Sequence, residues 1–395
     1  MNRSSTSARS GLARFLLAGL VISFVATQVP WDDRLSGPGD AWHVRGELLG
    51  SWTADEVAFR PEGASAIPDD WRGSVEDALR SGEEVVLTKG GTIEWEPGLL
   101  TALGGLRVSS VLGVVAAVLG GFFFGVTRWW RLLSLCGVST PYLAVARLTM
   151  LGMFFNLVVP GLTGGDVVKA GLAAKQHPGG RARAVMAVGL DRVIGFWALL
   201  MIALVSSVFM REELGVLIGP LAVLAAGLSV AIFVFVHPSF RRLLLDGGLG
   251  RLLPRRLSGL FDALRSISGR PGEFLIASIL SVGNHVCIGL AVLSVARGMG
   301  DQTSFLGCLA ATVVSSAVSA VPIAPGGWGV GEAAYAAMFS LLGSGEAVGF
   351  AISVSYRLCQ TAISLVCGAA LWRGGRDDWV AEAESSGGTG LARSS

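Results

Sequence analysis

The sequence FNLVVPGLTGGDVVK at residues 155–169 decides how this chain folds. It ends an apolar run at Pro160, adds several glycines, and then places the charged residues Asp166 and Lys169. A Pro-Gly break stops a helix, and lipid cannot satisfy the backbone groups that the break leaves open. Both flanks of this stretch are basic, so both of its ends are expected in the cytoplasm. We therefore predict a re-entrant hairpin that is buried in protein or lines a wet cavity.

A second stretch, PGGWGVGE at residues 325–332, has the same order of a Pro-Gly break, further glycines and one carboxylate, Glu332. Arg192 and Arg357 follow the carboxylates of their respective stretches by 26 and 25 residues. We predict a second re-entrant hairpin over residues 305–343, open to the outside where the first is open to the cytoplasm. Paired Gly/Pro-interrupted segments of this kind mark a midplane binding site in secondary transporters. The two halves are therefore predicted to form an inverted repeat.

The composition excludes an ordinary cytosolic enzyme. Of the 395 residues, 52% are hydrophobic and only 15% are charged, whereas soluble domains carry about 25% charged residues. The basic residues punctuate apolar runs instead of forming a concentrated basic surface, so no nucleic-acid partner is expected. Five cysteines lie in apolar stretches with no disulfide or metal-ligand spacing, and no cofactor is predicted. We expect a multi-pass protein of the cell (inner) membrane.

Six full spans are predicted from the apolar runs, and the run at 108–127, about 20 residues long, is enough for roughly 30 Å of hydrocarbon. They cover residues 15–29, 108–127, 184–210, 214–236, 274–296 and 347–372. Trp129 and Trp130, flanked by Arg128 and Arg131, are predicted to be an interfacial anchor. Positive-inside counting places both termini in the cytoplasm, together with the loop at 237–273, which holds seven arginines against three acids.

The segment over residues 30–104 is too polar for lipid. Residues 30–100 hold 15 of the 29 acids and 6 of the 31 bases. We predict a small β-rich extracytoplasmic insert, in which residues 83–88 and 92–95 form a β-hairpin around a Gly turn. A partly ordered loop is the alternative, because this length supports only a thin core.

The predicted fold class is therefore an all-α polytopic membrane protein with a small β-rich insert. An N-terminal anchor helix covers residues 1–29; it resembles a signal peptide, but no A-x-A cleavage site is visible. The insert at 30–104 is followed by a transmembrane domain at 105–375 and a disordered cytoplasmic tail at 376–395.

Charged residues within apolar runs indicate a binding site. Each costs about 2.5–3.5 kcal/mol at mid-bilayer and persists only if it is paired or wetted. Arginine and free helix N–H groups suit phosphate, which makes a lipid headgroup a natural ligand for one cavity near the midplane. The candidate substrate-binding residues are Arg128, Asn156, Gly164, Gly165, Asp166, Lys169, Arg192, Gly326, Gly327, Glu332 and Arg357.

Less specific readings of these residues stay open at this point. Asp166 with Arg192 and Glu332 with Arg357 equally suit structural ion pairs or interfacial snorkelling. Asp191 is an alternative local partner for Arg192. We expect His285, inside a span, to make a helix contact and not to act as a proton relay.

The motifs resemble the lysylphosphatidylglycerol synthase transmembrane-region family. The residues that carry the resemblance are Arg128-Trp129, Phe155-Asn156, Pro160-Gly161, Gly164-Gly165-Asp166, Lys169, Asp191-Arg192, Pro325-Gly326-Gly327, Gly329 and Glu332. The resemblance covers about residues 105–375 and implies a domain with re-entrant hairpins that handles anionic or polyprenyl-linked lipids. The chain departs from the family pattern in three respects. The insert is longer than expected, Lys169 stands where the family often has Arg, and only about 20 residues follow Trp372, so an aminoacyl-transferase domain is not expected.

Three classes of function fit these observations. The first is a flippase or transporter of anionic phospholipid or polyprenyl-phosphate-linked lipid. The second is a membrane enzyme, or an accessory subunit, of lipid-linked glycosylation or lipid modification, in which Asp166 and Glu332 serve as acid and base. The third is a scaffold whose acidic insert binds a partner protein. No Walker A loop, HExxH or GxSxG motif occurs, so ATP-driven pumping by this chain alone is not expected.

The predicted topology is testable by cysteine labelling. In a cysteine-free background, a membrane-impermeant maleimide added from outside should modify Ser81→Cys in the insert and leave Ser258→Cys in the basic loop unmodified. Permeabilised cells provide the control, since both positions should then react. External labelling of Ser258→Cys would overturn the orientation and with it the inverted repeat.

Overall fold

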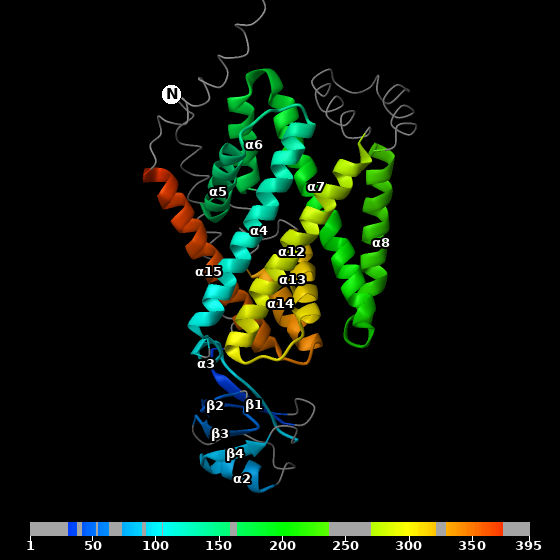
Figure 1. Ribbon diagram of the computed structural model, residues 1–395. Coiled ribbons are helices and arrows are strands. Elements are labelled where there is room, and N and C mark those ends of the chain that lie inside the picture. The colour runs from blue at the N-terminus through cyan, green and yellow to red at the C-terminus, as the bar shows by residue number, and fades with distance from the viewer. Residues whose placement is uncertain are drawn as a thin grey trace, which may run out of the picture. The chain divides into compact units, whose positions relative to one another are not determined.

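The computed structural model describes residues 31–37, 42–52, 54–62, 73–88, 92–104, 106–158, 164–236, 270–320 and 329–373. These residues form a small sheet near the N-terminus and a set of long and short helices (Figure 1). Several predicted features lie outside the described residues. They are the anchor at 1–29, the Pro-Gly segments at 160–163 and 325–328, most of the basic loop (237–269), and the tail at 376–395.

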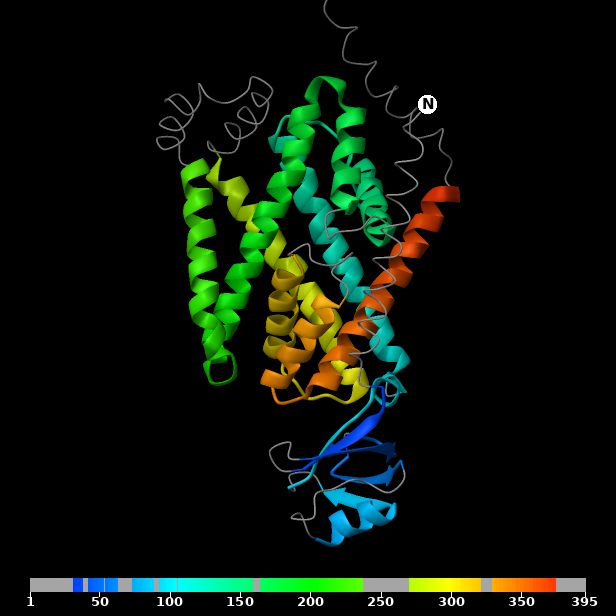
Figure 2. The ribbon, with the colours of Figure 1, turned by 180° about the vertical axis from the view of Figure 1, so that it is seen from behind.

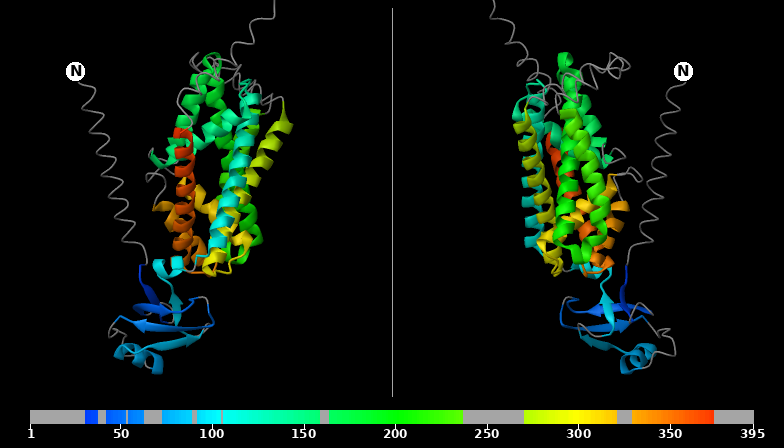
Figure 3. Two further views of the ribbon diagram at one scale, coloured as in Figure 1. Left: turned by 60° about the vertical axis from the view of Figure 1, so that its left-hand side comes forward. Right: turned by 90° about the vertical axis from the view of Figure 1, so that its right-hand side faces the viewer.

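The insert contains an antiparallel five-stranded sheet and two short helices. The strands are β1 (Asp33–Ser36), β2 (His43–Leu49), β3 (Glu56–Pro61), β4 (Val85–Thr88) and β5 (Glu94–Glu96), and the helices are α2 (Ser74–Ser81) and α3 (Leu99–Gly104). Figure 3 shows α2 beside β4. The predicted β-rich insert is thus present as a sheet.

The predicted hairpin within this sheet is wrong. The strand order is β4-β3-β2-β1-β5, so β4 and β5 lie at opposite edges. β4 pairs with β3, and β5 pairs with β1, where Arg34 and Glu96 form an ion pair at 2.6 Å. The alternation of apolar residues marks where a strand lies and which face it buries, but it does not select the strand's partner.

Alternating side chains build the core of the insert. In β4, Val85 and Leu87 are buried, while Val86 between them is 66% exposed. Phe59 from β3 and Leu79 from α2 are fully buried against the same side of the sheet. The insert therefore has a hydrophobic core of its own, which favours an ordered domain over a loop.

The transmembrane region begins with α4 (Val108–Leu135) and consists of helices. The others are α5 (Tyr142–Val158), α6 (Gly164–Gln176), α7 (Arg181–Phe209), α8 (Arg211–Val236), α12 (Pro271–Met299), α13 (Phe305–Ser319), α14 (Val330–Leu341) and α15 (Glu346–Arg373). Among the described residues, five helices (α4, α7, α8, α12 and α15) are long and apolar enough to cross a membrane. They correspond to five of the six predicted spans, and the sixth lies outside the described residues.

The remaining helices form two pairs of short elements. Helix α5 lies beside α6, and α13 lies beside α14 (Figure 2). The sequence connecting each pair carries one of the two Pro-Gly breaks. Each pair thus occupies the place at which a hairpin was predicted.

The chain divides into two compact units. Unit 1 comprises the described residues within 1–118, 206–216 and 288–359, and unit 2 those within 119–205, 217–287 and 360–395. Unit 1 contains the insert with α13 and α14, and unit 2 contains α5 and α6. Each unit therefore contains one short helix pair and one of the two predicted carboxylate–arginine pairs.

Asp33 fastens the insert's sheet to α3. Its carboxylate is 4% exposed and accepts hydrogen bonds from the backbone N–H groups of Leu48 and Gly98, and from the hydroxyl of Thr101. Removing it leaves two buried N–H groups without an acceptor, at about 1–3 kcal/mol each. We predict that Asp33→Ala increases amide hydrogen exchange in β1 and β2 of the full-length protein by at least tenfold. Asp55→Ala, at an exposed position of the same domain, should leave exchange unchanged; equal exchange in the two variants would contradict this role.

Candidate functional site

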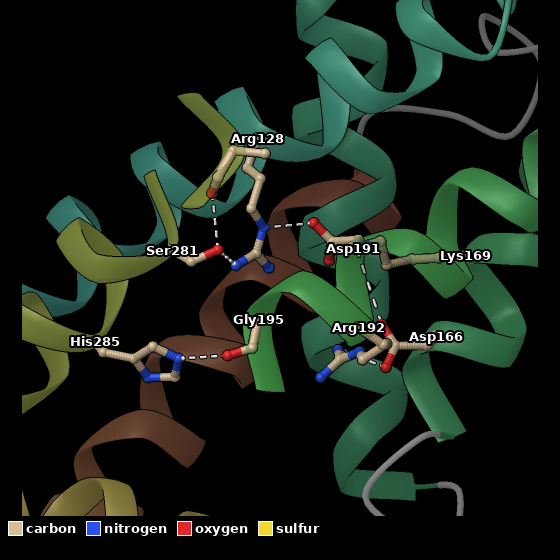
Figure 4. A network of polar contacts seen from close by, with 9 residues as sticks. Arg128, Asp166, Lys169, Asp191, Arg192, Gly195, Ser281 and His285 are labelled. Carbon is tan, nitrogen blue, oxygen red and sulfur yellow. Dashed lines mark hydrogen bonds and ion pairs between the residues drawn. The ribbon is translucent and has the colours of Figure 1, made fainter. Parts of the chain in front are cut away.

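Arg128 and Asp191 form a buried ion pair at the centre of a polar network in unit 2 (Figure 4). The Nε–H of Arg128, on α4, donates to Asp191 Oδ1 on α7 at 2.7 Å, and its Nη1 donates to Ser281 Oγ on α12 at 2.6 Å. The side chains of Arg128 and Asp191 are 10% and 6% exposed. One guanidinium thus joins three helices. The prediction that Arg128 belongs to an interfacial anchor is wrong, because its charge is neutralised inside the unit.

The neighbouring Arg192 takes a different partner. Its guanidinium lies 2.5 Å from Asp166 Oδ2, which is the ion pair that the sequence had left open as one of several readings. Successive residues on a helix point about 100° apart, so Asp191 and Arg192 face different neighbours. Asp191 is therefore not the local partner of Arg192, an alternative that the sequence had left open.

Asp166 is shared by two cations of very different exposure. Lys169, one turn further along α6, places its Nζ 4.0 Å from Asp166 Oδ1. The side chains of Asp166 and Lys169 are 7% and 8% exposed, whereas that of Arg192 is 54% exposed. The exposed guanidinium is thus the group of this cluster that an incoming ligand can reach.

Trp129 holds Lys169 in place. The ammonium group lies 4.1 Å from the centroid of the indole ring, which is fully buried. A cation over the face of a tryptophan is attracted by the ring's negative π surface. The prediction of an interfacial position for Trp129 is therefore wrong. An arginine–tryptophan pair at the end of a span suits either the membrane interface or the buried interior. Only the packing of α6 against α4 shows that Trp129 lies in the interior.

The beginning of α6 is stabilised by α5. Asn156 Oδ1 accepts the backbone N–H of Gly165 at 2.7 Å and so satisfies one of the free donors of a helix N-terminus. A Cβ at Gly165 would collide with the backbone carbonyl of Gly152 on α5. Glycine is needed there because the two backbones touch, as in other close-packed membrane helices. Asn156 and Gly165 thus shape the helix end that carries Asp166, and Gly164 is the first residue of α6.

The second predicted pair forms in unit 1. Arg357 Nε, on α15, lies 3.0 Å from Oε1 of Glu332 on α14, and the side chains are 17% and 0% exposed. Glu332 Oε2 also accepts the backbone N–H of Gly329 at 2.6 Å, which satisfies a donor at the start of α14. A Cβ at Gly331 would overlap the guanidinium of Arg357. The glycine therefore allows the arginine to lie against the first turn of α14.

The two units differ in charge. With all groups ionised, the unit 2 cluster (Arg128, Asp166, Lys169, Asp191 and Arg192) has three cations and two carboxylates, hence one net positive charge. The Glu332–Arg357 pair of unit 1 is neutral. An excess cation in a low-dielectric setting attracts an anion. Arg192 offers the planar donor set that binds phosphate or carboxylate in a bidentate manner.

Some members of this network were not among the candidates. Ser281 and Gly195 carry no sequence signal beyond their place in apolar runs. His285 Nε2 contacts the backbone carbonyl of Gly195 at 3.1 Å, which agrees with the predicted helix contact. Asp191 was detectable as an acid within a span, but its partner was not. Of the predicted binding residues, Gly326 and Gly327 lie outside the described residues.

The sequence comparisons place the chain in a family. Residues 98–368 match the model of the lysylphosphatidylglycerol synthase TM region. The protein belongs to this family of membrane domains, whose name connects it with lipid handling. Neither the curated proteins nor the solved structures include a match to the chain.

The Arg128–Asp191 pair should be essential for stability. Arg128→Met leaves a buried carboxylate without its cation, which costs about 3–5 kcal/mol. We predict a clear fall in the thermal unfolding temperature of the purified protein, and partial recovery when Asp191→Leu is added. Arg131→Met is the matched control on the same helix, because Arg131 and Glu273 are about one-third exposed and such pairs contribute about 0–1 kcal/mol. Equal unfolding temperatures for the two single variants would disprove this role.

Proposed function

We propose that the protein is a lipid flippase or transporter that handles anionic phospholipid or polyprenyl-phosphate-linked lipid without a nucleotide site of its own. The observation that carries the proposal is the excess positive charge of the unit 2 cluster, presented by the half-exposed Arg192. A cation in this position is costly among apolar helices unless it is paired, wetted or functional. The phosphate of a headgroup would replace Asp166 as the anion that binds the guanidinium of Arg192. Lys169 would continue to neutralise Asp166 during that exchange.

The short helices support passage of a polar headgroup. Helices α5 and α14 have 17 and 12 residues, which at 1.5 Å per residue is about 26 Å and 18 Å. Both fall short of the roughly 30 Å of hydrocarbon. We propose that each short pair is a re-entrant hairpin, one open to the cytoplasm and the other to the outside, as an inverted repeat. Broken helices of this kind provide backbone donors within a membrane.

The family assignment supports a lipid as the ligand. The family is named after the membrane region of lysylphosphatidylglycerol synthase, a protein that is itself named after a phospholipid. Unit 1 contributes a second arginine, Arg357, that already binds a carboxylate. We propose that the headgroup meets each of the two arginines within its own unit during transport. The protein would act in the inner membrane with both termini in the cytoplasm.

A translocation assay tests the proposal. Purified protein in liposomes should accelerate the movement of fluorescently headgroup-labelled phosphatidylglycerol between leaflets, followed by dithionite quenching of the outer leaflet. Arg192→Gln should slow this movement about tenfold or more, since a hydrogen bond to a charged group contributes about 1.5–3 kcal/mol.

Arg131→Gln is the matched control, an arginine of unit 2 whose partner Glu273 lies outside the cluster. It should transport at the rate of the unaltered protein. The proposal fails if no anionic or polyprenyl-phosphate lipid in a broad panel is accelerated. Unchanged rates in both Arg192→Gln and Arg357→Gln would show instead that the buried charges serve only as scaffold.

A further inference from the structure

Glu332 is the most enclosed acid of the described residues. Its side chain is fully buried. Oε2 accepts a hydrogen bond from the backbone N–H of Gly329, and Oε1 lies 3.0 Å from Arg357 Nε. Other titratable groups also lie on the three helices that meet here. The buried ones are Cys308 on α13, Tyr335 on α14, and Tyr356 on α15. All three are neutral in their ordinary state near pH 7, so none of them replaces the charge of Arg357.

The two carboxylates of the predicted site, Asp166 and Glu332, differ in the number of cations that lie beside them. Asp166 has Arg192 and Lys169. Within the part of the chain that the structure describes, Glu332 makes its ion pair with Arg357 alone. If a phosphate takes Arg192, Asp166 keeps Lys169. If a phosphate takes Arg357, Glu332 becomes a buried carboxylate without a countercharge.

An unpaired buried carboxylate takes up a proton instead of staying charged. Leaving it ionised costs several kcal/mol in a low-dielectric interior. The backbone donor of Gly329 alone does not compensate a full charge, whereas the neutral acid keeps that hydrogen bond through its carbonyl oxygen. The hydroxyl of Ser319, which lies against the neighbouring Gly331, is a nearby polar group for the new O–H donor.

We propose that the protein couples the movement of an anionic lipid to the binding of one proton by Glu332. This inference rests on the proposed function and names its coupling ion. In the exchange, the guanidinium of Arg357 gives up its ion pair with Glu332 and donates to a phosphate oxygen. A proton from water on the open side forms the O–H bond of Glu332. When the lipid leaves, the proton leaves too and the ion pair forms again.

Charge is balanced throughout this exchange. Before binding, Glu332 and Arg357 are together neutral. After binding, the neutral acid, the guanidinium and a singly charged phosphodiester are also neutral together. One lipid with one negative charge therefore crosses with one proton, and the cycle moves no net charge. Transport should respond to a pH gradient and not to membrane potential.

The experiment applies the pH gradient and the membrane potential separately. Liposomes containing the full-length protein and fluorescent phosphatidylglycerol are given a pH difference of one unit with the potential clamped by potassium and valinomycin. A one-to-one electroneutral coupling accumulates the lipid in one leaflet up to tenfold. Internal pyranine should report a proton flux that depends on the lipid. A potassium diffusion potential at equal pH should produce no accumulation.

Glu332→Gln separates coupling from transport. Glutamine accepts the backbone N–H of Gly329 as glutamate does but does not ionise, so the tenfold accumulation driven by the pH gradient should disappear. Glu346→Gln, an exposed carboxylate in the same unit, should keep the accumulation. Because the gradients are also applied to the unaltered protein, the test holds even if Glu332→Gln does not fold.

The outcomes distinguish the inference from the proposed function. Lipid exchange that is equally fast and symmetric with and without a pH gradient would overturn proton coupling and leave the flippase proposal standing. Accumulation of lipid that is driven by membrane potential and not by the pH gradient would also overturn proton coupling. No acceleration of any lipid under any gradient would overturn both.

Discussion

A charge held among apolar helices needs a partner, and unit 2 is arranged around one such pair. Arg128 reaches from α4 to Asp191 on α7 and Ser281 on α12, so one guanidinium fixes three long helices against each other. Losing either member leaves the other as an uncompensated buried charge. The pair is thus a condition for the packing of the unit, and the neighbouring groups are positioned relative to it.

The exposure of Arg192 follows from that pair. Because Asp191 is committed to Arg128, Arg192 depends on Asp166 from α6, and Lys169 approaches the same carboxylate. Lys169 is fixed over the buried indole of Trp129. The accessible cation is therefore Arg192, and with all groups ionised the cluster has one positive charge more than it needs for internal neutrality. This excess charge is the physical basis of the proposal that the protein binds an anionic ligand.

Unit 1 also pairs its buried charge with an opposite charge, but it uses fewer groups. Glu332 and Arg357 neutralise each other, and the carboxylate also caps the start of α14. In the proposed cycle, Glu332 takes up a proton when Arg357 binds the anion, which would connect ligand binding to protonation. The insert in the same unit has an independent core, and Asp33 ties its sheet to α3. Binding chemistry and insert stability thus depend on different residues.

The sequence alone determined the class of protein, five membrane spans and the positions of both short helix pairs, and it offered Asp166–Arg192 and Glu332–Arg357 as candidate ion pairs among other readings. Hydropathy and the Pro-Gly breaks are local signals, and they persist in the fold because lipid cannot satisfy exposed backbone polar groups. The tertiary structure decided the partner of Asp191, the burial of Trp129 and the pairing of β4 with β3. Each of these depends on which element packs against which, and residues far apart in the chain supply the contacts. Local periodicity gives the face that a side chain occupies, whereas only packing gives the group that it meets.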